Sequence, residues 1–320
     1  MKFTKYFDLQ MFANMNTQTT ATSTLSDEMK VYYSDYLIDN AVPKLVHDQF
    51  GQKHPIPKNG GKTIEFRKYS PLPKLLTPLT EGVTPDGQSL TVTTIEATID
   101  QYGGYVTISD MLQLTAIDNN MVQATKLRGN QAGASLDTIT REVLNGGTNV
   151  VYAGGVSGRA ALTAEHKLTV DDIKKAVRAL KNQNAEKIGD SYVAIIHPDV
   201  TYDLTNDPAW QAVKDYDPKD WYEGEIGKIA GVRFVETTEA KIFEGGVYST
   251  LILGDNAYGV TEIEGGGLQH IVKQLGSAGT ADALDQRATV GWKATKVAER
   301  LVEQFMVRIE SKCSFAGEAN

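Results

Sequence analysis

The sequence predicts an α+β protein that carries a long two-stranded arm. Three observations support this prediction: alternating segments on both sides of a proline-rich stretch between residues 55 and 100, helical periodicity across residues 118–145, and interleaved helix and strand signals from residue 169 onward. The 320 residues fit one large domain or two of moderate size. We find no repeat with a period of about 20–50 residues, which argues against a solenoid or a propeller.

The composition excludes several classes of protein. With 41% hydrophobic and 22% charged residues, the chain is unlike a disordered protein. The 32 basic and 40 acidic side chains leave a net charge of −8, which argues against a general nucleic-acid binder. The single cysteine, Cys313, excludes an intrachain disulfide and a multi-cysteine zinc site. No apolar run approaches the roughly 18 residues that span a bilayer, so no membrane partner is expected.

The N-terminal part predicts an arm followed by a helix. Residues 13–25 are small, polar and rich in Thr, so we expect a flexible segment or one that a partner orders. Ser26 then precedes an amphipathic pattern that includes Met29, Tyr32 and Tyr36, which predicts a capped helix that ends before Pro43.

The next segment predicts the two-stranded arm. Residues 63–67 and 90–99 alternate as strands do, and between residues 55 and 85 lie six of the ten prolines, which keep the tip irregular. The tip carries apolar side chains with no core of their own: Leu72, Leu75, Leu76, Leu79 and Val83. Because an isolated ribbon is only marginally stable in water, something must cover these side chains, and another subunit is the simplest candidate.

A strand ending at Ser109 and Asp110 and a long helix come next. Asp118 is placed to cap the helix, and Gly146 and Gly147 are placed to end it. Apolar residues recur at helical steps at Met121, Ala124, Leu136, Ile139 and Val143. Gly129 and Gly133 inside this helix allow two interpretations, an imperfect helix or close backbone packing along one face.

The remaining chain predicts a more regular α/β region. Thr169 is placed to cap a helix, residues 192–196 form a buried strand, and His197 and Pro198 open a short helix. A loop rich in Trp and Asp follows at residues 206–225, and strands are expected at 227–235 and 251–254. The alternation near the end predicts one long strand from Thr295 to Lys312 or a pair of strands.

No catalytic or cofactor-binding pattern emerges from the sequence. Gly60, Gly61 and Lys62 lack the glycine spacing of a phosphate-binding loop, and a strand rather than a helix follows them. The histidines lack metal-ligand spacing, His197 is expected to be structural, and Cys313 is expected to be a buried thiol. A hydrolase that uses carboxylates remains an alternative from another class, but no spacing supports its candidates, which are Asp203, Asp207 and Asp215.

Charges are unevenly distributed along the chain. Basic residues concentrate around the arm, and residues 203–225 are acidic. Complementary patches of this kind steer association between copies, although simple solvated faces would have the same composition. The basic residues are Lys53, Lys58, Lys62, Arg67, Lys68 and Lys74.

Several segments together resemble the major capsid proteins of tailed bacteriophages, in particular the family typified by the coat protein of coliphage N-four. The segments are LVHDQFGQ at 45–52, PIPKNGGKTIEFR at 55–67, PLTEGVTP at 78–85, QYG at 101–103 through DM at 110–111, AG at 132–133 through LD at 136–137, and TNVVYAGG at 148–155. The resemblance is dense over residues 25–165 and looser, in the same order, to about residue 312.

The resemblance implies the Hong-Kong-97-type capsid fold. It divides the chain into an N-terminal arm and first helix (1–54), an extended loop (55–104), a peripheral domain with a spine helix (105–168 and 291–320) and an axial domain (169–290). The extended loop would contact a neighbouring subunit through Lys62, Arg67, Leu72, Leu75, Leu76, Leu79 and Val83. The spine helix would include Met121, Gly129, Gly133, Leu136 and Ile139. An axial-domain loop near the symmetry axes would include Trp210, Asp215 and Trp221.

The function implied by the resemblance is structural, without catalysis or a cofactor. The chain would assemble through hexamers and pentamers into an icosahedral head shell around double-stranded DNA, in the host cytoplasm, and would reside in the virion. Its partners would be copies of itself, a separate scaffold, a portal, decoration proteins and DNA bound without sequence preference. No motif marks Lys62 or Lys74 for crosslinking. A shell protein of an encapsulin-type bacterial compartment is the alternative with the same fold.

Overall fold

The computed structural model describes residues 46–115, 120–214, 227–277, 282–315 and 317–320. These residues belong to one compact unit, Val42–Asn320. The expected N-terminal arm and its helix, the Asp118 cap, and the candidate residues Asp215 and Trp221 lie outside the described residues.

The first sheet, called here the β13 sheet, is organised around one long strand. It contains β1 (Gln52–Lys53), β4 (Asp100–Ser109), β11 (Tyr258–Thr261), β12 (Gln269–Lys273) and β13 (Arg287–Arg300). β13 pairs antiparallel with β4 on one edge and with β12 and β11 on the other, and β1 joins β11 in parallel. Strands far apart in the sequence therefore meet on β13.

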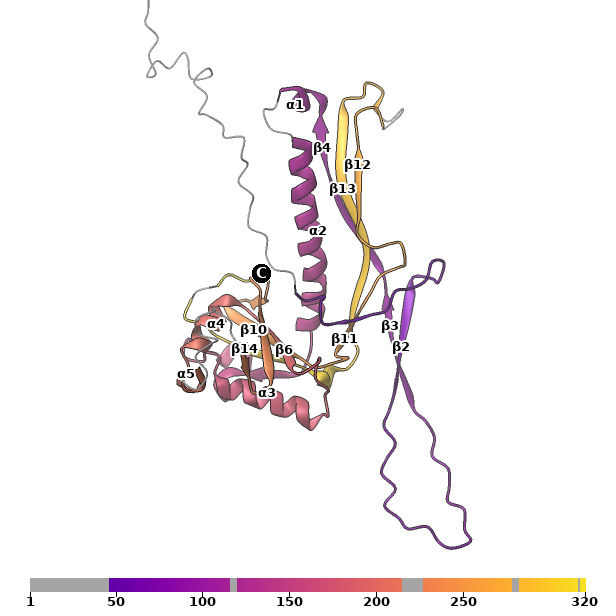
Figure 1. The fold of residues 1–320 in the computed structure, drawn as a ribbon, viewed down its shortest axis with the longest axis vertical. Helices are drawn as coiled ribbons and strands as arrows, with labels where there is room; N and C mark the ends of the chain where they lie inside the picture. The colour runs from indigo at the N-terminus through magenta and orange to yellow at the C-terminus, as the bar shows by residue number, and fades with distance from the viewer. Residues whose placement is uncertain (1–45, 116–119, 215–226, 278–281, 316) are drawn as a thin grey trace, which may run out of the picture. The chain divides into compact units, whose positions relative to one another are not determined.

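A long helix covers the β13 sheet. α2 (Asn120–Asn145) has 26 residues, which at about 1.5 Å each give about 39 Å, and it packs along β13 and β4 (Figure 1). The expected long helix is confirmed over these residues. A short helix that the sequence did not predict, α1 (Asp110–Thr115), follows β4, and Ser109 Oγ accepts a hydrogen bond from the Leu112 N–H at 3.2 Å.

The two-stranded arm is present as predicted. β2 (Thr63–Tyr69) and β3 (Val92–Thr98) pair antiparallel, with Phe66 opposite Ile95, and residues 70–91 between them form neither helix nor strand (Figure 1). Before the arm, Asn59 and Gly61 have positive φ angles of 66° and 93°. The glycine pair therefore belongs to a turn that enters the arm.

The second sheet, called here the β10 sheet, contains the larger core. Its strands are β5 (Val150–Tyr152), β6 (Tyr192–Ile196), β7 (Lys228–Ile229), β8 (Val232–Glu236), β9 (Ile242–Phe243), β10 (Val247–Leu253) and β14 (Met306–Ser311). Every residue of β6 and β10 is buried, as expected for strands covered on both faces. The predicted buried strand at residues 192–196 is confirmed.

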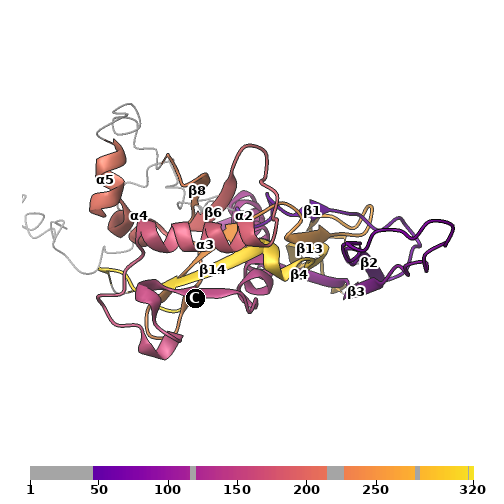
Figure 2. The same cartoon turned by 90° about the horizontal axis from the view of Figure 1, so that it is seen from below.

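Helices pack against the β10 sheet. α3 (Val170–Asn182) lies in the foreground when the molecule is seen from below (Figure 2), and its apolar side packs into the core with β6, β10 and β14. α4 (Pro198–Thr205) and α5 (Pro208–Lys214) follow β6. The short 3-10 helices are η3 (Ala153–Gly155), η4 (Arg159–Ala161) and η6 (Glu303–Phe305).

The predicted helix cap at Thr169 is confirmed, and His197, which was predicted to open a short helix in a structural role, also acts as a cap. Thr169 Oγ1 accepts a hydrogen bond from the Asp172 N–H at 3.3 Å, and His197 Nδ1 accepts one from the Asp199 N–H at 3.2 Å. The side chain of His197 therefore has a structural role at the start of α4. Partial burial lowers the pKa of His197, and the nearby Asp199 only partly offsets this effect.

One strand prediction needs correction, and another, which had two alternatives, is decided. The strand expected at 227–235 is instead a hairpin, because Ala230 and Gly231 both have positive φ angles (53° and 81°) and turn the chain between β7 and β8. At the C-terminal end the strand pair replaces the single strand: β13 and β14 are separated by η6 and belong to different sheets. The pairings thus cross the expected domain boundaries, since β11 and β12 join β13, and β14 joins β10.

Candidate functional site

The arm is anchored at its base and open at its tip. The Ile99 N–H donates to the Lys62 carbonyl at 2.9 Å, and the Phe66 ring lies against Gly259 and His54. The base of the ribbon therefore packs on the β13 sheet. The irregular residues 70–91 beyond the strands are exposed throughout.

The tip exposes large apolar side chains. The side chains of Leu75, Leu76 and Leu79 are 80%, 85% and 76% exposed, and those of Leu72 and Val83 are 50% and 63% exposed. A folded chain normally buries Leu, because each fully buried side chain contributes about 1.5–3 kcal/mol. Among the residues that the structure describes, nothing supplies this burial for the leucines of the tip. A surface of this kind marks a contact site.

Two charged candidates on the arm form local pairs. Lys62 Nζ lies 3.1 Å from Asp100 Oδ1 at the base, and Arg67 Nε lies 3.3 Å from Glu65 Oε1 on the same strand. All four side chains are at least 40% exposed, so each pair contributes little to stability, about 0–1 kcal/mol. Their predicted part in a subunit contact stays a prediction.

The spine-helix candidates lie only partly in the core. Met121, Gly133, Leu136 and Ile139 are half-buried, and Gly129 is exposed. A Cβ added at Gly129 would have no described atom within 4 Å, so nothing within the chain requires a glycine at this position. Of the two interpretations of the glycines, close packing inside the chain therefore fails at Gly129.

The buried face of the C-terminal half of α2 is largely polar, which the sequence analysis missed. The residues of this helix that are buried are Ala132, Asp137, Thr140, Arg141, Leu144 and Asn145. Counting apolar residues at helical steps could not find this face, because four of its six members are polar. Each of these polar side chains has a specific partner, and together with those partners they form what we call the α2 joint.

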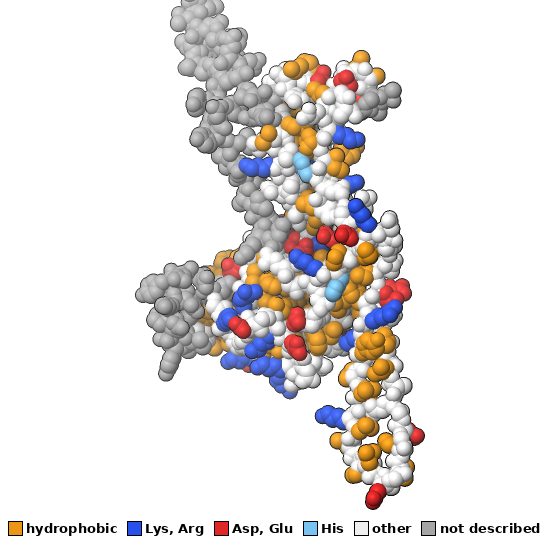
Figure 3. Space-filling model, turned by 45° about the vertical axis from the view of Figure 1, so that its right-hand side comes forward, with side chains coloured by type: hydrophobic (Ala, Val, Ile, Leu, Met, Phe, Trp, Pro, Cys, Tyr) orange, Lys and Arg blue, Asp and Glu red, His pale blue; other side chains and the backbone are white. Residues whose placement is uncertain are grey.

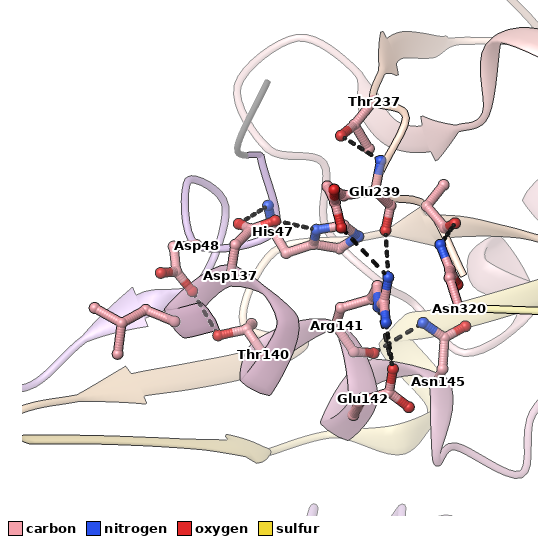
Figure 4. Close-up of polar contacts among 12 residues, drawn as sticks. His47, Asp48, Asp137, Thr140, Arg141, Glu142, Asn145, Thr237, Glu239 and Asn320 are labelled. Carbon is pink, nitrogen blue, oxygen red and sulfur yellow. Dashed lines mark hydrogen bonds and ion pairs between the residues drawn. The ribbon is translucent and has the colours of Figure 1, made fainter. Parts of the chain in front are cut away.

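The upper part of the α2 joint holds the segment that precedes β1. Both carboxylate oxygens of Asp137 contact His47 (Figure 4). Oδ1 accepts a hydrogen bond from the His47 backbone N–H at 2.9 Å, and Oδ2 lies 2.6 Å from His47 Nδ1. Asp48 accepts from Thr140 Oγ1 at 2.5 Å and also pairs with Lys296 of β13. His47 and Asp137 are almost fully buried, at 0% and 3% exposure.

Lys296 connects this cluster to the β13 sheet. Besides its pair with Asp48, it donates to the Leu136 carbonyl of α2 at 2.7 Å. Burial lowers the pKa of Lys296, and the neighbouring Asp48 and Asp137 partly offset this effect. The helix, the segment before β1 and the β13 sheet are therefore joined by paired charged groups. Such an arrangement loses several kcal/mol when one partner is removed.

The lower part of the α2 joint holds the loop before β9. Arg141 donates from Nη1 to the Glu239 carbonyl at 3.0 Å and from Nη2 to Glu142 Oε1 at 2.8 Å (Figure 4). Lys241 Nζ donates to the same Glu142 oxygen at 3.0 Å. Partial burial alone would raise the pKa of Glu142, but the hydrogen bonds from Lys241 and Arg141 outweigh it and hold the pKa below its ordinary value.

Two arginines donate hydrogen bonds to backbone carbonyls at the C-terminal end of α2. Arg300 donates to the Val143 carbonyl at 2.7 Å, and Arg308 donates to the Asn145 and Gly147 carbonyls, the latter at 3.0 Å. Cationic groups satisfy the last carbonyls of a helix and favour the negative end of its dipole. The predicted end of the helix near Gly146 and Gly147 is confirmed, and its partners come from β13 and β14.

Of the axial-loop candidates, the structure describes Trp210, and this residue does not lie in a loop. Trp210 belongs to α5, is 1% exposed, and packs edge-on against Phe234 with ring centroids 5.8 Å apart. The expectation of a loop at Trp210 is therefore wrong: the indole lies in the core of the β10 sheet.

The carboxylates of the hydrolase alternative have structural partners. Asp203 accepts hydrogen bonds from the Ser314 N–H (2.7 Å) and Oγ (2.5 Å), and Asp207 accepts from the Val170 and Ala209 N–H groups. Cys313 is buried as predicted, and burial raises the pKa of its thiol to about 12. A thiol with this pKa is a poor nucleophile at neutral pH.

In the described ranges, no group of three His, Cys, Asp or Glu side chains lies close enough to hold a metal ion. None of the helices described combines the length and apolar character needed to cross a membrane.

Comparison with known proteins identifies the family and the fold. A family model described as phage capsid protein matches residues 92–300, which is more than half of the chain. No curated protein matches. The capsid of cyanophage Pam1 is similar with a TM-score of 0.71 at 14% identity, covering 92% of this chain and 98% of that one.

Two further capsid structures give the same result. The capsid of cyanophage P-SCSP1u is similar with a TM-score of 0.69 at 14% identity, covering 90% of this chain and 94% of that one. The capsid of Ralstonia phage GP4 is similar with a TM-score of 0.68 at 15% identity, covering 94% of this chain and 100% of that one. At these identities the likeness shows the fold, which is the α+β Hong-Kong-97-type fold that was expected.

Proposed function

Because the chain belongs to the phage capsid protein family, we propose that it is a major capsid protein that assembles through hexamers and pentamers into an icosahedral head shell. The observation that carries this proposal is the arm, which is anchored at its base and exposes Leu72, Leu75, Leu76 and Leu79 at its tip. An apolar tip on an arm that is anchored at its base is suited to bind a surface outside its own chain.

The tip is proposed to pack on another copy of the chain. A neighbouring copy offers exposed apolar residues of its own on α1 and the first half of α2: Met111, Leu112, Leu114, Val122 and Leu127. Burying several leucines per subunit supplies several kcal/mol at about 1.5–3 kcal/mol each, from which the entropy of association must be subtracted. Repetition around a closed shell makes such modest contacts sufficient.

The strand pairings favour a modified division into domains. We assign α2 and the β13 sheet to the peripheral domain, and the β10 sheet with α3, α4 and α5 to the axial domain. Residues 258–273 then move from the axial to the peripheral domain, and β5 and β14 move the other way. The α2 joint lies where the two domains meet, so it would fix how the spine helix sits on the axial domain.

The finer parts of the proposal come from the resemblance and the family. They are a shell that encloses double-stranded DNA, a separate scaffold, a portal, decoration proteins, assembly in the host cytoplasm and residence in the virion. The relation to coliphage N-four belongs with them. No enzymatic activity is proposed, which agrees with the structural partners of Asp203 and Asp207. The encapsulin alternative is not favoured, because the family model and the three structures compared concern phage capsids.

The test is assembly of the full chain, expressed alone and together with its neighbouring genes. Size-exclusion chromatography and negative-stain electron microscopy are expected to show pentamers, hexamers or closed particles. A stable monomer or dimer under both conditions would contradict the proposal. Neighbouring genes for a cargo enzyme instead of a terminase or portal would favour the encapsulin alternative.

A further inference from the structure

The outer side of α3 carries a stripe of basic residues. Lys174, Arg178 and Lys181 follow one another at steps of four and three residues, which places them on one side of a helix, and all three are exposed. At 1.5 Å per residue they are separated by about 6 Å and about 4.5 Å along the axis. The opposite side of α3, with Ile173 and Leu180, is buried in the core.

The side chains of this α3 stripe form no ion pair within the described chain, although the pKa of Asp171 is lowered mainly by Lys175 and in part by the charge of Lys174. Lys175 is tied to Asp171 at 2.8 Å and to Asp172 at 3.2 Å. No ion pair joins Lys174, Arg178 or Lys181 to another described residue. Over residues 170–187 there are five basic and three acidic side chains, so the net charge is 5 − 3 = +2 in a chain whose total is −8. The segment that carries the stripe is therefore positively charged in a protein whose net charge is negative.

The stripe is open to solvent and contains no apolar anchor. Seen from below, no other element passes in front of α3 (Figure 2), and Lys and Arg side chains gather along the lower edge of the space-filling view, where α3 lies in Figure 1 (Figure 3). The exposed side chains of α3 are all polar or charged: Asp171, Lys174, Lys175, Arg178, Lys181 and Asn182.

We propose that the α3 stripe binds the phosphate backbone of double-stranded DNA, an inference that rests on the proposed function. Stable protein interfaces have an apolar or aromatic centre that loses its water on binding; the arm tip offers apolar side chains for such a centre, and this surface offers none. A polyanion, by contrast, is bound by exposed Lys and Arg through release of its counterions and needs no apolar contact. Because charge alone would also suit an acidic second copy, it is the lack of an apolar side chain on this surface that favours nucleic acid.

The proposal predicts a defined salt dependence. If each of the three side chains neutralises one phosphate, the slope of log K against log salt is about −0.9 for each, or about −2.7 in total. Raising the salt from 50 to 200 mM would then weaken binding about 40-fold. Since the contact is with phosphate, duplexes of different sequence should bind equally.

The test uses the full chain in its unassembled fraction from size-exclusion chromatography and a fluorescent 30-base-pair duplex. The variant is Lys174→Glu, Arg178→Glu and Lys181→Glu together. The matched control is Lys228→Glu, Lys273→Glu and Lys293→Glu, which makes the same change of charge at exposed positions on β7, β12 and β13. Circular dichroism establishes that each variant is folded, and electron microscopy records shell formation separately.

We expect the α3 variant to lose at least tenfold in affinity at 50 mM salt and the control to lose less than threefold. Equal losses in the two variants, or no binding by the unaltered chain, would overturn the inference while shells still form and the proposed function stands. Unchanged DNA binding with lost shell assembly in the α3 variant would instead show that the stripe contacts protein, which also overturns it.

Discussion

The tip of the arm and the α2 joint differ in what they leave exposed. The tip leaves leucines such as Leu75 and Leu76 in solvent, whereas the joint buries charged and polar side chains such as Asp137 and Arg141. Among the described residues, the leucines of the tip have little cover, whereas the polar side chains of α2 in the joint are paired, although His47 Nε2 in the same joint is buried without a hydrogen-bond partner. The comparison indicates that the joint stabilises the subunit, whereas the tip is left available for the proposed contact with another copy.

The largest expected effect comes from breaking the joint at its most buried pair. Asp137→Ala removes the acceptor of both His47 contacts and leaves a buried imidazole without it. We expect a loss of about 3–5 kcal/mol in the free energy of unfolding, measured by urea denaturation of the unassembled chain. The control Asp100→Ala breaks the exposed pair with Lys62 and should change stability by less than about 1 kcal/mol. Similar values for both variants would refute the distinction.

A smaller loss is expected from a single hydroxyl of the joint. Thr140→Ala removes the hydrogen bond to Asp48, and a bond to a charged group is worth about 1.5–3 kcal/mol. Thr140→Ser keeps the hydroxyl and should retain most of this contribution. If the two variants lose equal stability in the same urea titration, the methyl group rather than the hydrogen bond matters here.

The joint should also weaken in acid. The pKa of Glu142 in the folded chain lies below the unfolded value of 4.5, because the hydrogen bonds from Lys241 and Arg141 outweigh burial. Its contribution is therefore fully present above pH 4.5 and is lost as the pH falls through the folded-state pKa. Urea midpoints measured between pH 7 and pH 3 should fall more steeply for the unaltered chain than for Glu142→Gln. Parallel curves would exclude this role for Glu142.

The smallest effect on subunit stability is expected at the tip. Replacing Leu72, Leu75, Leu76 and Leu79 together by Ser should change the free energy of unfolding by less than about 1 kcal/mol, because these side chains are already in solvent. The same variant should fail to form particles in electron microscopy. Normal assembly of this variant would show that the tip does not hold copies of the chain together.

Much of the fold could be predicted because its signals are local. The arm strands alternate over a few residues, the prolines keep the tip irregular, and Thr169 and His197 lie immediately before the helices that they cap. The leucines of the tip were also predicted correctly as residues without a core. Each of these signals depends on neighbours within a few positions along the chain.

Other features depend on contacts between distant residues and could not be predicted. Trp210 follows an acidic, polar stretch, yet it fills the core of the β10 sheet against Phe234. The final alternating segment divides between two sheets because β13 and β14 find different partners, β4 and β10. No periodicity within the segment distinguishes these partners.

The sequence by itself determined the length of α2, the two strands of the arm and the apolar tip, because hydrophobic periodicity, prolines and caps act locally. Only the tertiary structure decided that one face of α2 is polar and buried. His47 and Asp137 are 90 residues apart, and Asp48 and Lys296 are 248 apart. A charged side chain can enter the interior only where the fold brings its partner to it, and that meeting is a property of the whole chain.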